Sequence, residues 1–273
     1  MNILITGANG FLGRSLRSSN ILENHNLFFT TRKELDVLNR DEVFEYIHSN
    51  NIDVIIHTAV VGHPGKDSIQ TLRCNLKSDL NILQAHRMVD KIIIFGSGAE
   101  YNTMLPIENV VETDEIKSPP IGYYGLGKYT ISNAARCIPN VYNLRLFGCF
   151  GPEENDIRFI KANLNKYKND EPMFITKDRF MDFIYIDDLL LLIECVINTN
   201  SRIKEINCIY EKKYKLSDIA NIINNQNEHT VPIDVPKIAK GLNYTARANN
   251  ISFFRLKLKG LEQGIKEMFN GKD

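Results

Sequence analysis

The chain has 273 residues, with 33 Lys and Arg against 33 Asp and Glu, so its formal net charge is zero. This balance disfavours a general nucleic-acid coat, because phosphate binding needs a basic excess. A hydrophobic fraction of 43% and a charged fraction of 24% are typical of a globular chain and disfavour intrinsic disorder. No apolar run approaches the roughly 20 residues of a membrane helix, and the first residues lack a signal-peptide pattern. We therefore expect a cytoplasmic protein with no membrane partner.

The cysteines and histidines disfavour disulfides and metal sites. The 5 cysteines are widely spaced and include no CxxC pair, which is typical of reduced and mostly buried thiols. The 6 histidines form no HxxxH or HxH pair. We expect neither a disulfide nor a protein-bound metal ion.

The first half of the chain alternates between short apolar runs, which predict strands, and amphipathic segments, which predict helices. In chain order the expected elements are strand 2–6, helix 11–18, strand 26–31, helix 41–48, strand 53–57, helix 69–86, strand 91–95, helix 122–137 and strand 140–147. Continuous apolar strands separated by amphipathic helices indicate a parallel sheet covered on both faces. With right-handed crossovers this is a doubly wound, Rossmann-type α/β fold.

The pattern loosens after Gly151. Helices are expected at 155–167, 187–198, 216–224 and 261–269, and strands at 172–176, 183–186 and 206–210. There is no internal repeat and no long linker. We predict a cofactor-binding Rossmann domain over residues 1–151 and a smaller α/β substrate-binding cap over residues 152–273, with segments that return to the first domain.

Gly7, Gly10 and Gly13 form a GxxGxxG pattern between the first strand and the first helix. Glycines at these positions permit a tight turn, close approach of the backbone to a pyrophosphate, and close packing of helix on strand. The phosphates then lie at the helix N-terminus, where unpaired N–H groups point outward. A plain glycine-rich turn is the weaker alternative.

The end of the second strand decides between NAD and NADP in dinucleotide enzymes. A carboxylate there would bond the ribose 2′-hydroxyl, whereas this chain has Arg32 followed by Lys33. The planar fork of arginine suits a 2′-phosphate. We therefore expect NADP(H), with a solvated Arg-Lys pair as the alternative. Asp36 and Val37 follow where the adenine edge would lie.

Tyr124 and Lys128 form a YxxxK pair, and Ser97 follows a predicted strand. Four-residue spacing puts the tyrosine and lysine on one helix face, and open α/β sheets bind ligands at the carboxyl ends of their strands. A phenol with a reference pKa of about 10 is a poor acid at neutral pH, and a lysine ammonium nearby lowers that pKa. Serine adds a second hydrogen bond to the reacting oxygen. The three residues predict proton transfer to a carbonyl oxygen as nicotinamide delivers hydride, or the reverse.

These motifs resemble the extended short-chain dehydrogenase/reductases, a family of nucleotide-sugar epimerases, dehydratases and ketoreductases. The resemblance covers nearly the whole chain. Residues 144–152 are similar to the family's LRxxNxYGP, residues 182–188 to its DFIxVDD, and residues 261–265 to its closing SLEEGI helix. Residues 31–36 and 59–62 look most like nucleotide-sugar 4-ketoreductases of the GDP-L-fucose synthase type.

The resemblance implies roles for the matching positions. Ser97, Tyr124 and Lys128 match the catalytic residues. The cofactor-binding positions, besides Tyr124, Lys128 and the Arg32 segment, are Gly7, Asn9, Gly10, Phe11 and Leu12 at the pyrophosphate, and Thr58, Ala59 and Val60 beside the nicotinamide ribose. The expected substrate-binding positions are Gly98, Ala99, Phe147, Gly148, Arg158, Arg179 and His63. For His63 a solvated loop is an equal alternative.

The chain departs from the fucose synthase pattern at several positions. Ala99 replaces a cysteine that epimerisation needs, and residues 151–160 lack the accompanying histidine, with Arg158 closest to its place. These changes favour a simple ketoreductase. Gly148 stands where many relatives carry a substrate-contacting asparagine. Met181 replaces a pyrophosphate-binding arginine, and Arg179 could reach from the same strand face.

Five polar or reactive positions have a structural interpretation. We expect His57 to be a hydrogen-bonded core residue, Cys149 a packed thiol, and Asn75 a structural residue. Asp187 and Asp188 precede a predicted helix, as an N-cap and a partner of the helix dipole.

The expected function is NADPH-dependent reduction of the C4 ketone of a nucleotide-linked 4-keto-6-deoxy sugar. The sugar is a GDP-, dTDP- or CDP-linked hexose or heptose for surface-polysaccharide biosynthesis. Tyr124 would donate the proton, Lys128 would tune Tyr124 and bind the nicotinamide ribose, and Ser97 would orient the ketone. Two alternatives remain: an NAD-dependent nucleotide-sugar C4 epimerase, and a non-catalytic NADP-binding sensor or scaffold. The resemblance also implies a homodimer.

Overall fold

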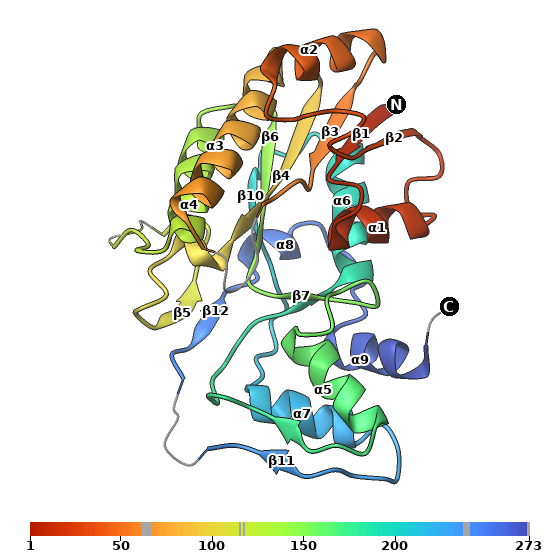
Figure 1. Cartoon of the computed structure of the whole chain (residues 1–273), viewed down its shortest axis with the longest axis vertical. Coiled ribbons are helices and arrows are strands. Elements are labelled where there is room, and N and C mark those ends of the chain that lie inside the picture. Colours follow the sequence, from red (N-terminus) through yellow and green to blue (C-terminus); the bar gives the residue numbers. More distant parts are fainter. Residues whose placement is uncertain (62–66, 115, 117, 237–240, 272–273) are drawn as a thin grey trace. The chain divides into compact units, whose positions relative to one another are not determined.

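The computed structural model describes the chain except for residues 62–66, 115, 117, 237–240 and 272–273 (Figure 1). The contacts divide it into two compact units, whose segments interleave along the sequence. Unit 1 comprises Met1–Asn102, Glu112–Arg145 and Leu190–Ile206. Unit 2 comprises Thr103–Val111, Leu146–Leu189 and Asn207–Asp273.

Unit 1 is built on a six-stranded sheet with the order β10-β6-β4-β3-β1-β2. β1 pairs in parallel with β2 and β3, and β3 pairs in parallel with β4. The expected doubly wound fold is confirmed. In chain order the strands are β1 (Asn2–Thr6), β2 (Asn26–Thr30), β3 (Val54–His57), β4 (Lys91–Ser97), β6 (Val141–Leu146) and β10 (Glu205–Cys208), of which β10 only begins in unit 1.

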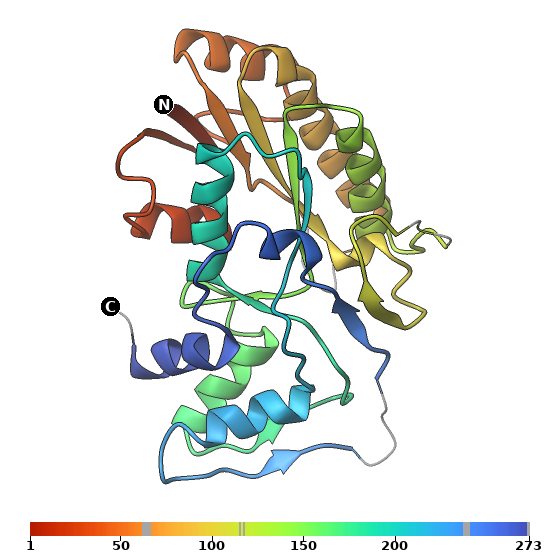
Figure 2. The same ribbon diagram turned by 180° about the vertical axis from the view of Figure 1, so that it is seen from behind.

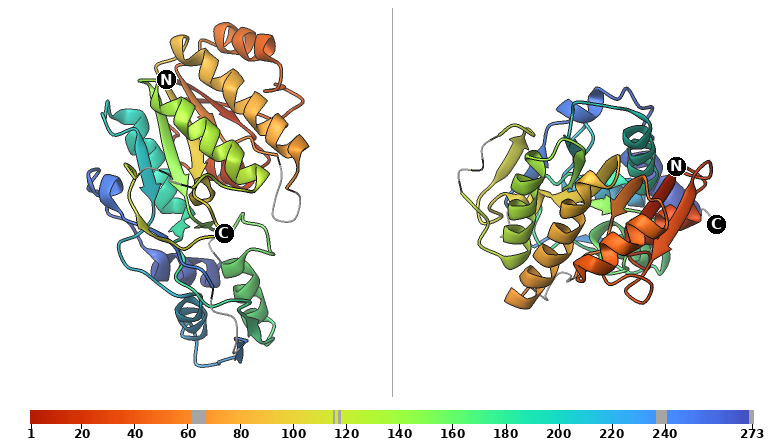
Figure 3. Two further views of the ribbon diagram at one scale, coloured as in Figure 1. Left: turned by 90° about the vertical axis from the view of Figure 1, so that its left-hand side faces the viewer. Right: turned by 90° about the horizontal axis from the view of Figure 1, so that it is seen from above.

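Helices cover both faces of this sheet (Figures 1 and 3). α2, α3 and α4 lie on one face, and α1 with residues 190–198 of α6 lies on the other. Apolar side chains of the strands and of α2, α3 and α4 form a continuous core, in which Leu4, Val43 and Ile92 are fully buried. The bounds are α1 (Phe11–Ser18), α2 (Arg40–Ser49), α3 (Ile69–Gln84) followed by η1 (Ala85–Arg87), α4 (Tyr123–Arg136) and α6 (Ile186–Asn198).

The strand order defines where a ligand can enter unit 1. β2 pairs on one side of β1, and β3, the next strand in the chain, pairs on the other side. The connections therefore reverse direction at β1, and such a switch point opens a crevice beyond the carboxyl ends of the strands. The glycine loop follows β1 at this edge.

The described residues of unit 2 form three two-stranded parallel sheets and four further helices, in accord with the expected α/β cap (Figure 2). The strand pairs are β7 (Cys149–Phe150) with β9 (Ile184–Tyr185), β8 (Met173–Phe174) with β11 (Ile233–Asp234), and β5 (Ile107–Val110) with β12 (Tyr244–Ala246). The helices are α5 (Phe159–Lys168), α7 (Leu216–Asn224), α8 (Asn249–Ser252) and α9 (Leu261–Asn270). The expected strands 172–176 and 183–186 correspond to β8 and β9, whereas β5, β7, β11 and β12 were not expected, because so short a strand carries little periodicity of its own.

The cysteines are free thiols, but the expectation that most are buried is wrong. Cys149 and Cys208 are buried, Cys74 and Cys195 are partly exposed, and Cys137 is exposed. The three less buried cysteines lie on or at the end of helices whose apolar face is turned to the core, and they fall outside that face. None of the described helices is long and apolar enough to cross a membrane.

Candidate active site

The loop after β1 can be formed only with glycine at two positions. Gly7 has a φ of +70°, and a Cβ there would lie 2.7 Å from the backbone nitrogen of Ala59. A Cβ at Gly13 would lie 2.5 Å from the carbonyl oxygen of Gly7. Thr58 joins the loop to β1, because its hydroxyl donates to the carbonyl of Thr6 at 2.7 Å. The backbone here is packed too closely for side chains, as the glycine pattern predicted.

The loop presents the start of α1. Gly10 is the N-cap residue, and no side chain accepts hydrogen bonds from the first turn. The amides of that turn are therefore available to an anion, which the helix dipole also favours. Asn9 is exposed, and Phe11 and Leu12 are partly exposed beside it.

Arg32 lies just beyond the end of β2 with its side chain 78% exposed. The end of β2 adjoins the glycine loop, because the amide of Ala8 donates to the carbonyl of Thr30 at 3.0 Å. Arg32 contacts Asp36 at 3.5 Å, and an exposed pair of this kind contributes little stability. The guanidinium can therefore leave Asp36 and bind a phosphate with little loss of free energy. Val37 is held by Asn81 of α3, whose amide donates to its carbonyl at 2.9 Å.

The segment after β3 is fixed by Asn75 on α3. The side-chain oxygen of Asn75 accepts from the amide of Val61 at 2.7 Å, and its nitrogen donates to the carbonyl of Val61 at 2.9 Å. The expected structural role of Asn75 is confirmed, and it positions the exposed Val60. His63, an expected substrate residue, lies outside the described residues.

Ser97 ends β4 and starts the short helix η2 (Gly98–Glu100). Its hydroxyl oxygen accepts from the amide of Ala99 at 3.1 Å, and its own amide donates to Glu100 Oε1 at 3.0 Å. This reciprocal arrangement is a capping box, which fixes the serine at the carboxyl end of the strand.

A buried ion-pair network supports this turn. Glu100 and Arg145 are both fully buried and pair at 2.9 Å between Oε2 and Nε. Arg145 also contacts Glu205 at 3.3 Å, and Arg136 of α4 pairs with the other oxygen of Glu205 at 2.6 Å. Glu100 and Glu205 outweigh burial and raise the pKa of Arg145, which therefore stays charged. The network joins η2, β6, β10 and α4, and it reaches Ser97 through Glu100.

The first turn of α4 lies against the Ser97 turn. A Cβ on Gly125 would lie only 2.5 Å from the carbonyl oxygen of Ala99, so α4 and η2 are in direct contact. Asp67 caps the helix, accepting from the amides of Tyr123 at 2.9 Å and of Tyr124 at 2.8 Å. Tyr124 remains 36% exposed and is accessible to a ligand.

Lys128 lies one turn further along α4. Its ammonium donates to the carbonyl of Phe95 at 2.8 Å, two residues before Ser97 on β4. Burial alone would lower the pKa of Lys128, but Asp79, Tyr124 and Glu100 outweigh burial and raise it. The structure thus brings the Ser97 turn, the tyrosine turn and the lysine to one end of β4.

Three acidic residues of this region were missed by sequence reasoning: Asp67, Asp79 and Glu100. Asp67 acts on the distant Tyr123 and Tyr124, and no spacing rule connects them. Glu100 did carry a signal, because Ser97 and Glu100 have the S-x-x-E spacing of a capping box. Asp79 did carry a signal, because Asn75, Asp79 and Ile82 share a helix face and are buried. A polar residue on such a face needs a partner in the fold.

In unit 2, Gly148 cannot be replaced by the asparagine common in relatives without rearrangement. A Cβ there would lie 2.5 Å from Cδ1 of Phe183. The Phe183 ring packs edge-on against Phe150 at 6.4 Å between centroids. The neighbouring Phe147 is buried, with its ring 5.0 Å from that of Tyr244. An aromatic cluster occupies the space that a polar side chain would need.

Arg179 is a partly buried cation in unit 2. Its guanidinium donates to the carbonyl of Leu242 at 3.4 Å and to Sδ of Met181 at 3.5 Å, and lies 5.9 Å above the ring of Tyr244. Burial lowers its pKa. Within the described part of the chain, no carboxylate forms an ion pair with it.

Arg158 is the N-cap residue of α5 and pairs with Glu154 at 3.3 Å between Nε and Oε1. Glu154 is 5% exposed, and its Oε2 has no hydrogen-bond partner. Burial raises the pKa of Glu154 to about 7. Cys149 is buried close by, and burial raises the pKa of its thiol, in accord with the expected packed role.

His57 and Asp188 also have contacts that define their structural roles. His57 is buried and hydrogen-bonded through both ring nitrogens, as expected. Neither Asp187 nor Asp188 is an N-cap, because α6 already begins at Ile186, but both lie in its first turn, as the expected interaction with the helix dipole requires. Instead Asp188 accepts from the hydroxyl of Tyr210 and from the amides of Lys259 at 2.8 Å and Gly260 at 3.0 Å. These hydrogen bonds fix the segment that leads into α9.

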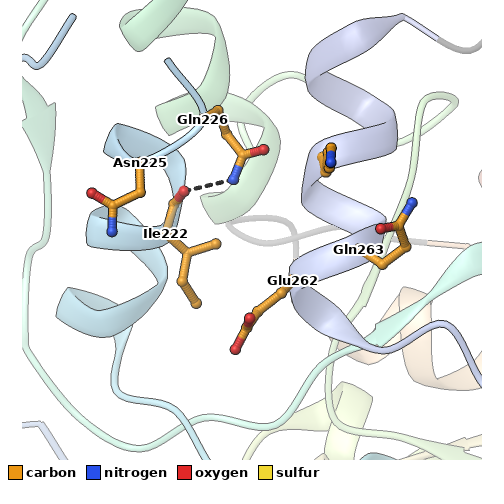
Figure 4. Close-up of a pocket in the computed structure, with 6 residues that line it drawn as sticks. Ile222, Asn225, Gln226, Glu262 and Gln263 are labelled. Atoms are coloured by element: carbon orange, nitrogen blue, oxygen red, sulfur yellow. Dashed lines mark hydrogen bonds between the residues drawn. The ribbon is translucent and has the colours of Figure 1, made fainter. Parts of the chain in front are cut away.

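Figure 4 shows a groove between α7 and α9 in unit 2. None of the predicted site residues lines it, so its chemistry is separate from the site described above. The lining residues are Ile222, Asn225, Gln226, Glu262, Gln263 and Lys266. Within the described residues no three His, Cys, Asp or Glu side chains gather as a metal site.

The fold and the Ser97, Tyr124 and Lys128 arrangement define a dinucleotide-dependent enzyme class, and the sequence comparison agrees. Residues 3–209 match the model of the NAD dependent epimerase/dehydratase family. The match covers well over half of the chain, and the chain belongs to this family. The expectation of an enzyme of this kind is confirmed.

Individual relatives are distant. GDP-L-colitose synthase of Yersinia pseudotuberculosis is 24% identical over 250 residues, covering 82% of this chain and 81% of that protein. A dTDP-4-dehydrorhamnose reductase of Clostridium acetobutylicum superposes with a TM-score of 0.82 at 21% identity, covering 99% of each chain. A GDP-L-fucose synthetase of Naegleria fowleri bound to NADP also has a TM-score of 0.82, at 18% identity, covering 98% of this chain and 91% of that one.

Proposed function

We propose that the protein is an NADPH-dependent reductase of the C4 ketone of a nucleotide-linked 4-keto-6-deoxy sugar. The carrying observation is the contact of α4 with η2, which collects Ser97, Tyr124 and Lys128 at the end of β4. The curated relative, a GDP-L-colitose synthase, and the structural neighbours named for rhamnose and fucose synthesis support a nucleotide-sugar substrate.

A nicotinamide dinucleotide fits the described residues. The loop at Gly7 has no room for side chains, and the uncapped start of α1 suits the pyrophosphate. Arg32 is an exposed cation at the end of β2, which supports NADP over NAD. When bound, the reduced cofactor supplies a hydride.

The chain's own residues supply the proton and the orientation. Ser97 and Tyr124 hold the ketone oxygen by hydrogen bonds. Tyr124 transfers its hydroxyl proton to that oxygen as the carbonyl carbon receives hydride, giving a secondary alcohol. Lys128 stabilises the resulting phenolate by its charge and bonds the nicotinamide ribose.

Recognition of the sugar nucleotide is proposed for residues of unit 2. Arg179 is a cation without a carboxylate partner among the described residues, so it is our candidate for the diphosphate. Phe147, Gly148 and Arg158 are candidates for the sugar, together with Gly98 and Ala99 of unit 1. The absence of a cysteine at Ala99 supports reduction without epimerisation.

The direct test is NADPH oxidation with GDP-, dTDP-, CDP- and UDP-linked 4-keto-6-deoxy sugars. Tyr124→Phe removes the transferred proton, so turnover should fall by roughly 10²–10⁴-fold. The matched control is Tyr123→Phe, which changes the adjacent tyrosine of the same helix and should retain turnover. Wild-type rates in Tyr124→Phe would contradict the assignment.

The two alternatives give different results in the same experiment. A C4 epimerase would retain NAD through purification and interconvert sugars without net NADPH consumption. A sensor or scaffold would bind NADPH and leave every ketone unchanged.

A further inference from the structure

Asp79 is a buried carboxylate that the proposed reaction does not use directly. It lies on α3 and is 4% exposed. An ionised carboxylate is unfavourable in such surroundings unless hydrogen bonds and a cation compensate it. Its surroundings in unit 1 provide both.

The hydrogen bonds come through His57, at the end of β3. Nε2 of His57 lies 3.0 Å from Oδ1 of Asp79 and 3.2 Å from the hydroxyl of Ser78, and Nδ1 lies 2.7 Å from the hydroxyl of Thr6. A carboxylate can only accept, so we assign the proton on Nε2 to this bond. The chain of contacts fixes Asp79 to β3 and to the last residue of β1 before the glycine loop.

The cation is Lys128. His57, which contacts Asp79, is paired in register with Ile94 on β4, and the ammonium of Lys128 donates to the carbonyl of the next residue, Phe95, at 2.8 Å. The two charges therefore lie at the same end of the neighbouring strands β3 and β4. Although burial by itself raises the pKa of Asp79, Lys128 and the His57 hydrogen bond outweigh it, and the pKa lies below its ordinary value. Reciprocally, Asp79 is the strongest influence that raises the pKa of Lys128.

Other charges face Lys128 but are less able to balance it. The hydrogen-bond acceptor of its ammonium, the carbonyl of Phe95, is neutral. Glu100 also acts on Lys128, but it is paired at 2.9 Å with Arg145. Tyr124 acts on it from the preceding turn of α4. Asp79 is therefore the carboxylate that does most to keep Lys128 charged.

We propose that Asp79 is the buried counter-ion of Lys128, a positioning residue that keeps the lysine charged for its work on Tyr124. The role of Lys128 rests on the proposed function, whereas the electrostatic interaction of the two buried charges does not. Removing a nearby negative charge makes each neighbouring group lose its proton at lower pH. Reduction needs both the proton on Tyr124 and the charge on Lys128.

Asp79→Asn keeps the side-chain shape and removes the charge. We expect the alkaline limb of its kcat profile to move about one pH unit or more to lower pH, with KM for the sugar nucleotide nearly unchanged. Ser78→Ala is the matched control, because it removes a hydrogen bond to the same His57 without changing any charge. An unmoved limb in Asp79→Asn, or an equal displacement in Ser78→Ala, would overturn the proposal.

A second measurement does not depend on turnover. Urea unfolding of Asp79→Asn, Lys128→Met and the double variant forms a thermodynamic cycle. Each single change leaves one buried charge unbalanced, so the midpoint of the double variant should fall by less than the sum of the two single decreases. Additive decreases would exclude the counter-ion pairing. Non-additive decreases together with an inert wild-type protein would instead reject the proposed function alone.

Discussion

Glu154 shows how the fold changes the chemistry of a single residue. In the sequence it follows a Gly-Pro turn next to another glutamate and has no distinguishing pattern. In the structure it is buried with one oxygen unpaired, and burial raises its pKa to about 7 against an ordinary 4.5. The folded state therefore holds a proton there that the unfolded state has already released between those pH values.

This difference predicts a pH-dependent stability. Because the folded-state pKa is raised, the stabilisation is fully present below about pH 4.5 and is lost as pH rises through about 7. The loss attributable to Glu154 is at most about 3 kcal/mol. Urea unfolding between pH 4.5 and 8 measures it, and Glu154→Gln should flatten that part of the profile.

The matched control is Glu153→Gln, which removes the adjacent carboxyl group and should keep the wild-type slope. If Glu154→Gln keeps the same slope, the raised pKa is not responsible.

At the scale of elements, the buried ion pairs of Arg145 connect η2, β6, β10 and α4 next to Ser97. Arg145 on β6 satisfies Glu100, and Glu100 in turn fixes the amide of Ser97. The carboxylate of Glu100 also packs directly against the backbone of β4, because a Cβ on Gly96 would lie 2.4 Å from Oε1 of Glu100. Catalytic geometry and stability thus depend on the same carboxylate.

Arg145→Met should therefore lower the free energy of unfolding by about 3–5 kcal/mol, because it leaves the buried Glu100 charge without its cation. Turnover should fall as well, since the Ser97 turn loses its support. Denaturant unfolding and initial rates measure the two effects. Arg136→Met is the control: its partly exposed pair with Glu205 should contribute about 1 kcal/mol or less. Equal losses in both variants would show that burial does not decide the energetics.

At the scale of the whole molecule, cofactor binding should couple to thermal stability. A ligand that binds only the folded protein stabilises it by about 2.7 kcal/mol at one hundred times its Kd. For a protein of this size that stabilisation raises Tm by several degrees. The proposed contact of Arg32 with the 2′-phosphate predicts a larger Tm increase with NADPH than with NADH.

Thermal scans with each cofactor measure the difference, and Arg32→Ala should abolish it by reducing the NADPH effect alone. Arg40→Ala removes an exposed arginine of α2 outside the proposed site and should retain the difference. Equal Tm increases with both cofactors in the wild type would remove the argument for NADP. The homodimer and the cytoplasmic location stay predictions.

The sequence by itself determined the elements and the local motifs of unit 1. Apolar runs and helical periodicity predicted β1 to β4 and α1 to α4 within a few residues, because their signals are local. The glycine loop and the Tyr124–Lys128 spacing were readable for the same reason. In unit 2 the apolar runs indicated β8 and β9, whereas β5, β7, β11 and β12 were missed, because strands of two to four residues carry little periodicity.

Only the tertiary structure decided which charges meet. Asp67 reaches the amide of Tyr124 across 57 positions, and Arg145 reaches Glu100 across 45. Packing of segments that are distant in the sequence decides which of these residues meet. No local sequence pattern encodes that packing. Burial then decides their chemistry, because a carboxylate removed from water is either balanced, as at Asp79, or has a raised pKa, as at Glu154. The motifs predicted a class of reaction, and the fold supplies the charges that surround it.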